Sequence, residues 1–123
     1  MDGWGKKKRA LVPVSTFDKV ASSLIKNKSC FVVIDIEGAE LDCLKGAHTL
    51  LNSENDIVFL IEISVVGHFT KKVNVNPNLY ETFSLMDSYG YEAYTANNDL
   101  RKIELSEISS INVSNKNTLN TPN

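Results

Sequence analysis

Acidic side chains follow the two longest apolar runs of this 123-residue chain, and they are the residues best suited to chemistry. Asp35 and Glu37 come directly after the first run, with Gly38 behind them, and Glu62 lies near the end of the second. Ionised carboxylates in such places can accept hydrogen bonds from hydroxyl or ammonium groups, coordinate a divalent cation or act as a weak general base. The residue types alone leave these three roles open.

A purely structural role competes with each of these assignments. Glu37 and Glu40 can simply complement the positive N-terminus of a following helix, with Gly38 making the turn. Asp35 needs a partner or a purpose, because an acid that interrupts a buried strand is costly to desolvate. Glu62 either reaches a ligand crevice or pairs with a cation.

His68 lies in a predicted loop. A histidine there is ordinarily a surface residue, and the alternative is that it belongs to the functional site. Together with Asp35, Glu37 and Glu62 it offers the right residue types for a metal site, yet the spacing matches no known ligand pattern, and we expect no metal. A metal-dependent hydrolase is therefore a minor alternative. Cys30 and Cys43 fit no zinc or redox motif, so we expect both to be reduced and buried.

The elements that must position these residues are visible in the hydrophobic pattern. The apolar runs at 31–34 and 57–63 lack alternation, which predicts strands covered on both faces in a parallel sheet. Helical spacing predicts helices over 17–25, 39–51 and 76–90, the last with an Asn76 cap, Pro77 in its first turn and Gly90 at its end. Weaker strand patterns cover 11–14, 91–96, 100–105 and 108–113.

Helices alternating with strands predict an α/β layered sheet with right-handed crossovers. In such sheets ligands bind beyond the carboxyl ends of the strands. This rule places Asp35 and Glu37 from one strand, and Glu62 with His68 from the next, on one rim of the sheet.

Composition limits the class of protein. A 42% hydrophobic and 23% charged chain of this length suits one globular domain, and a net charge of -2 argues against a general nucleic-acid or anionic-membrane binder. No apolar run is long enough to span a bilayer, so we expect a cytoplasmic protein. We expect a basic, flexible N-terminus over 1–10, a folded domain over 11–114 and a disordered Asn/Thr-rich tail over 115–123.

The segment 34–47, Ile-Asp-Ile-Glu-Gly-Ala-Glu-Leu-Asp-Cys-Leu-Lys-Gly-Ala, closely resembles the hallmark of the FkbM-type methyltransferases, an apolar strand followed by D-x-E-G-A-E and L-x-x-L-x-G-A. Other segments agree with this family. Val14 to Asp18 resembles its V-x-T-L-D, with Phe17 in place of Leu, and Leu60 to Ile63 resembles the next strand with its glutamate. Segments 85–94 and 111–113 resemble its L-x-x-x-G-Y and its closing N-V strand.

This resemblance implies a partial class I methyltransferase fold, a Rossmann-like three-layer sheet that is mostly parallel with an antiparallel C-terminal strand. The family's glycine-rich cofactor loop, D-x-G-A-N-x-G, does not occur in this sequence. We therefore interpret the chain as the C-terminal part of that domain, a truncated fragment whose strands run in the order 4-5-7-6. Strand 31–36 would then be an uncovered edge, open to self-association or to another chain.

By resemblance, the implied activity is S-adenosylmethionine-dependent O-methylation of a sugar, glycan or secondary-metabolite hydroxyl. The implied cofactor-binding residues are Asp35, Glu37 and Gly38, and the implied catalytic candidates are Asp35, Glu62 and His68. Without the glycine-rich loop we expect feeble cofactor binding and no useful methyl transfer by this chain alone. The alternative is a non-catalytic α/β module that binds a partner or oligomerises.

Overall fold

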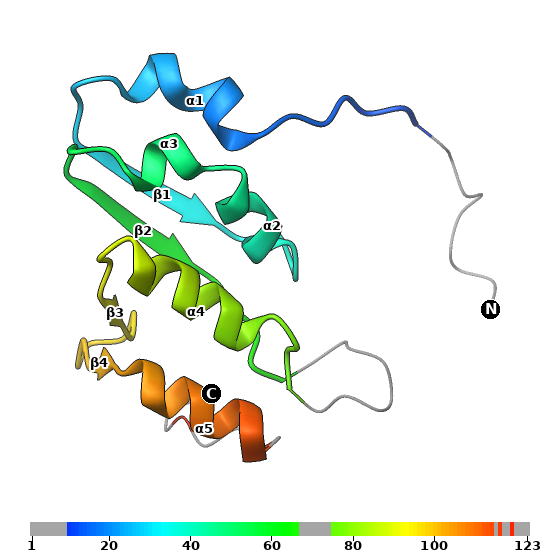
Figure 1. Ribbon diagram of the computed structural model, residues 1–123, viewed down its shortest axis with the longest axis vertical. Helices are drawn as coiled ribbons and strands as arrows, with labels where there is room; N and C mark the ends of the chain where they lie inside the picture. The colour runs from blue at the N-terminus through cyan, green and yellow to red at the C-terminus, as the bar shows by residue number, and fades with distance from the viewer. Residues whose placement is uncertain (1–9, 67–74, 115, 117–118, 120–123) are drawn as a thin grey trace.

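The structure, a computed structural model, describes residues 10–66, 75–114, 116 and 119. It is a mixed α/β arrangement with a small parallel sheet and a separate antiparallel strand pair (Figure 1). In chain order its elements are α1 (Phe17–Ile25), β1 (Cys30–Ile34), α2 (Glu40–Lys45), α3 (His48–Leu51), β2 (Ile57–Ile61), α4 (Leu79–Ser88), β3 (Ala93–Tyr94), β4 (Lys102–Ile103) and α5 (Leu105–Ser114).

The two apolar runs form the parallel sheet, as the sequence predicts. Cys30 pairs with Ile57 and Ile34 with Ile61, so β1 and β2 run in register from end to end. Alternate side chains of the two strands point to opposite faces. One face supplies Ile34 and Ile57 to the core, and the other carries Phe31 and Val58 to the surface.

Helices cover only one face of this sheet. The first core joins Ile34 and Ile57 to buried residues of the α2–α3 segment, and side chains from α1 and α4 pack against the same cluster. Figure 1 shows α2 and α3 in front of β1, with α4 beside β2. The buried members of this core are Ile34, Leu44, Ala47, Leu50, Leu51 and Ile57.

The opposite face of the sheet is apolar and open. Phe31 and Val33 of β1 are 66% and 61% exposed, and Val58 and Leu60 of β2 are 60% and 40% exposed. The prediction that both faces are covered is therefore wrong for the described residues. Unbroken apolar sequence cannot distinguish a strand that is covered from one that merely has a coverable face.

α1 begins and ends as predicted, and the Thr16 hydroxyl accepts a hydrogen bond from the Lys19 backbone N–H at 3.3 Å. The strand predicted over 11–14 is absent, since residues 10–16 form no helix or strand and Leu11 and Val14 are almost fully exposed. Pro13 lacks a backbone donor, and the segment runs away from the body of the protein in Figure 1.

The helix predicted over 39–51 is divided into α2 and α3. Gly46 ends α2, and its N–H reaches the carbonyls of Asp42 and Cys43. The break is held from outside, because the Gly46 carbonyl accepts a hydrogen bond from the Asp18 backbone N–H at 3.0 Å. Contact with the start of α1 therefore interrupts a helix that periodicity alone would continue.

α4 begins close to the predicted signal. The Asn76 side chain accepts the Asn78 N–H at 2.9 Å, and the Asn76 carbonyl accepts that of Leu79, so Asn76 organises the first turn although Asn78 is the residue next to the helix. Gly90, at φ 83°, ends the segment. The left-handed conformation there explains the glycine.

The region 108–113 was predicted as a strand and is helical. α5 buries Ile108 and Ile111, whose spacing is that of one helix face, in a second core formed with Val75, Leu79 and Leu119. The short strands β3 and β4 confirm the pair expected around residues 91–105.

The four strands do not join into the single sheet of order 4-5-7-6 that the resemblance implies. β1 pairs with β2 and β3 pairs with β4, and among the described residues the two pairs remain separate. The predicted basic N-terminus lies outside the described residues except for residue 10, as does most of the predicted tail.

Candidate acidic site at the carboxyl end of the sheet

The predicted acidic residues leave the parallel sheet at the same end. Ile34 and Ile61 are the last paired residues of β1 and β2, and the Glu62 backbone N–H bonds to the Ile34 carbonyl at 2.9 Å. Asp35 and Glu62 therefore follow neighbouring strands side by side, and both are exposed. The placement on one rim that the sequence predicts is present for these two carboxylates.

A tight turn presents Glu37 on the same rim. Glu37 has φ 47° and Gly38 has φ 103°, so two successive residues adopt left-handed conformations. A glutamate in this region is strained by roughly 1 kcal/mol or more, and such strain persists only where neighbouring contacts impose it. Glu37 and Gly38 are both exposed, so the turn lies at the surface of the protein.

The contact that imposes this turn comes from Glu40. Its carboxyl oxygen Oε1 accepts the Gly38 backbone N–H at 2.8 Å, and the residue is only 4% exposed. Glu40 was predicted to complement the helix N-terminus together with Glu37. The two have different roles in the structure, because Glu40 is turned inward to hold the loop and Glu37 is turned outward.

Cys43 lies one helical turn beyond Glu40 and is half-buried, as is Cys30, so both are less buried than predicted. Burial raises the pKa of the Cys43 thiol, and the negative charge of Glu40 raises it further. A raised pKa keeps sulfur in the unreactive thiol form. Cys43 is therefore held in the thiol form, and both cysteines are free.

Asp18 is an organising residue that the sequence interpretation used only as part of a motif. Its carboxylate accepts the backbone N–H groups of Thr49 at 2.8 Å and Leu50 at 3.1 Å, capping α3 from α1. Burial by itself raises the pKa of Asp18, but these hydrogen bonds outweigh it and hold the pKa below its usual value. Its place at the end of the segment that resembles V-x-T-L-D was the available signal, although nothing local indicates the distant partners.

The acidic rim lies outside two grooves that the described residues form. A groove of about 750 Å³ runs between β2, α4, β3, β4 and α5, and a smaller one of about 390 Å³ lies near the start of β2, beside Asn55 and Tyr91. Neither is lined by Asp35, Glu37 or Glu62. The rim supplies acceptors for hydroxyl or ammonium groups, and it lies outside both grooves.

The histidines add little to the site as described. His68 lies outside the described residues, so its relation to Asp35 and Glu62 stays a prediction. His48 is exposed on α3 with its ring edge-on to Tyr89 at 5.9 Å between centroids, a packing contact. Within residues 10–66 and 75–114, no group of three or more His, Cys, Asp or Glu side chains is arranged to hold a metal ion.

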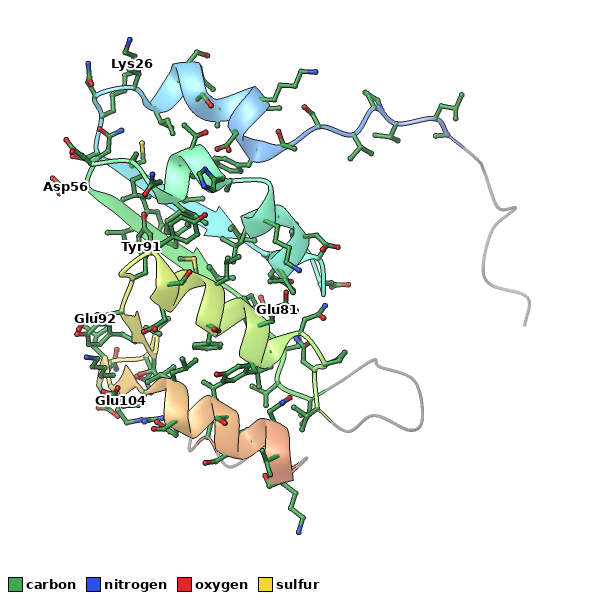
Figure 2. All side chains as sticks on the ribbon, in the orientation of Figure 1. Lys26, Asp56, Glu81, Tyr91, Glu92 and Glu104 are labelled. Carbon is green, nitrogen blue, oxygen red and sulfur yellow. The ribbon has the colours of Figure 1, made fainter. Side chains whose placement is uncertain are left out.

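Charged residues elsewhere form surface pairs. Lys102 of β4 contacts Glu92 at 2.8 Å and Glu104 at 3.8 Å, and both glutamates are labelled in Figure 2. Lys45 of α2 contacts Glu81 of α4 at 2.7 Å. Exposed pairs of this kind contribute little to stability, and none of these residues follows the parallel strands.

Comparison with known protein families identifies the class. The model of the methyltransferase FkbM domain matches residues 6–93, which is more than half of the chain. The match includes the rim, the Glu40 turn and Asp18. The protein therefore belongs to the FkbM methyltransferase family, whose members generally depend on S-adenosylmethionine. No curated protein and no solved structure shows significant similarity to the chain.

None of the described helices is both long and apolar enough to cross a membrane. The longest described helices, α4 and α5, have ten residues each.

Proposed function

We propose that this chain provides the acidic-rim part of an S-adenosylmethionine-dependent O-methyltransferase acting on a hydroxyl of a sugar, glycan or secondary metabolite. The observation that carries the proposal is the position of the D-x-E-G-A-E segment. In a chain of this family it lies at the carboxyl end of a parallel strand pair, where α/β proteins bind ligands.

Within this proposal the rim residues have distinct tasks. Asp35, Glu37 and the Gly38 backbone would face the cofactor, whose amino and hydroxyl groups suit carboxylate acceptors. Glu62 and His68 would face the acceptor, and Asp35, Glu62 or His68 would receive the hydroxyl proton. Methyl transfer is a direct displacement, so holding the two reactants in line contributes most to the rate.

The chain would be a partial domain that needs a complement. The glycine-rich segment is absent from the sequence, the rim lies outside both grooves, and one sheet face is open among the described residues, so a second polypeptide segment would complete the three-layer arrangement. Loss of several ligand hydrogen bonds, each contributing on the order of 1 kcal/mol, predicts affinity lower by orders of magnitude for the chain alone.

Calorimetric titration with S-adenosylmethionine tests the proposal. The chain alone should show no binding tighter than millimolar, and addition of the N-terminal half of a close relative, in cis or in trans, should produce binding. In the complemented protein Asp35→Asn should weaken binding, whereas Asp56→Asn should not, because the exposed Asp56 directly precedes β2, at the opposite end of the parallel sheet. Micromolar binding by the chain alone would contradict the need for a complement, and equal effects of the two variants would remove Asp35 from the site.

A non-catalytic, self-associating module is the second candidate. The specific observation in its favour is the unpaired edge of β1 beside the open apolar face. Failure of the complemented protein to bind the cofactor, together with a stable oligomer of the chain, would favour this candidate.

A further inference from the structure

The backbone of β1 is hydrogen-bonded on one side only. The Cys30 N–H bonds to the Asp56 carbonyl, and the Ile34 carbonyl accepts the Glu62 N–H, so Cys30 and Ile34 direct their polar groups toward β2. In a parallel ladder alternate residues face opposite sides. Phe31 and Val33 therefore direct their N–H and C=O groups to the free edge, where no described strand lies.

Nothing within β1 discourages a further strand. The strand carries no proline, no charged residue and no bulge, which are the usual means of protecting an edge. The residues with free backbone groups, Phe31 and Val33, are also those with exposed apolar side chains. Adding a strand here would pair the backbone and cover part of both side chains together.

Charges at the two ends of β1 select the direction of that strand. Lys26 and Lys28 precede β1, Asp35 and Glu37 follow it, and all four are exposed. Figure 2 shows Lys26 at the turn before β1, pointing away from the body of the protein. A parallel copy would place like charges together, whereas an antiparallel copy brings each basic end to an acidic end.

We infer that β1 pairs with β1 of a second copy of this chain in an antiparallel, two-fold symmetric dimer. With Val32 at the symmetry axis, Phe31 of one copy lies opposite Val33 of the other. Both are free-edge residues, so each such pair exchanges two backbone hydrogen bonds. The result is a continuous strand order β2-β1-β1-β2. This inference does not depend on methyl transfer.

The dimer and the proposed complemented enzyme would compete if the complement used the same edge. Two other modes of association are tested against this inference. In one, two open faces stack through Val58 and Leu60, and in the other the chain remains monomeric.

Size-exclusion chromatography with light scattering on the full chain at low ionic strength tests the inference. The expected mass is that of two chains. Val33→Pro should give a folded monomer, because the Val33 N–H is not used in pairing with β2 and proline is tolerated at such positions. Val58→Lys should remain a dimer, since Val58 lies on the open face of β2, away from the edge.

A charge exchange keeps the inference testable if Val33→Pro does not fold. Lys26→Glu/Lys28→Glu and Asp35→Lys/Glu37→Lys should each associate roughly tenfold more weakly, and mixing the two variants should restore dimers. A monomeric wild-type chain would overturn the inference. So would a dimer that Val58→Lys abolishes, or charge variants that show no recovery on mixing.

Discussion

Asp18→Ala should destabilise the protein although Asp18 belongs to no predicted catalytic set. The substitution removes both carboxylate acceptors from the Thr49 and Leu50 backbone N–H groups, and it releases α3 from α1. Hydrogen bonds to charged groups contribute about 1.5–3 kcal/mol each, but water can replace them at a partly exposed site, and loss of a capping residue costs about 0.5–2 kcal/mol. We expect the free energy of unfolding to fall by about 1.5 kcal/mol.

Urea unfolding followed by circular dichroism measures this change. Asp18→Asn keeps one side-chain carbonyl and should lose about half as much stability. Asp87→Ala is the matched control, since Asp87 is an exposed helical aspartate in α4 whose carboxylate makes no contact among the described residues. If Asp18→Ala and Asp87→Ala change the free energy of unfolding equally, the capping role is refuted.

The dependence on pH provides a second check on the same residue. The pKa of Asp18 is lowered in the folded protein from its usual 3.8, so its stabilising contribution is present above that value. The contribution is lost as the pH falls through the lowered folded pKa. The stability difference between wild type and Asp18→Ala should therefore be full at neutral pH and shrink in acid. A difference that grows in acid would contradict the assignment.

Five further substitutions, at Glu40, Gly38, Gly46 and Leu44, test the Glu40 turn and the first core by urea unfolding. Glu40→Ala should cost about 1–3 kcal/mol by leaving the Gly38 N–H without its acceptor, whereas Glu40→Gln should restore most of that loss. Gly38→Ala should cost roughly 1–2 kcal/mol because alanine is strained at the positive φ of this position; no atom lies within 4 Å of an added Cβ, so no steric clash contributes. Gly46→Ala should cost less, because Gly46 does not have a positive φ. Leu44→Ala should cost about 3 kcal/mol, since Leu44 is 1% exposed in the first core, and a loss below 1 kcal/mol would contradict that packing.

Local pattern predicted the elements around the rim well. Helix 17–25 and the two parallel strands are governed by apolar spacing and by the Thr16 cap, which are properties of neighbouring residues. Because β1 and β2 are parallel, Asp35 and Glu62, which directly follow them, lie at the same end of the sheet. The tasks proposed for these side chains in methyl transfer stay predictions.

The differences from the sequence interpretation come from contacts between distant segments. Gly46 ends α2, and its carbonyl accepts a hydrogen bond from the backbone N–H of Asp18. Asp18 is distant in sequence, so the pattern within residues 39–51 does not indicate this contact. The α5 error has another cause. The strand was predicted over 108–113 from strand-forming residue types, although Ile108 and Ile111 also have the three-residue spacing of one helix face.

Local context identified only part of the role of Glu40. Its place in the first turn of α2 is typical of an acid that complements the helix N-terminus. The inward rotation depends on the reversed direction of the chain at Gly38, which local spacing does not specify.

α4 is the only described element that supplies side chains to both cores. Leu85, Met86 and Tyr89 pack against the first core, whereas Leu79 and Phe83 belong to the second. Two cores that share one helix can open in turn rather than together. Amide protons of α5 should then exchange with solvent through a partial opening that leaves the parallel sheet intact. Amide protons of α4 should exchange only when the whole protein unfolds. The rim at the end of β1 would retain its shape during such excursions of the C-terminal segment.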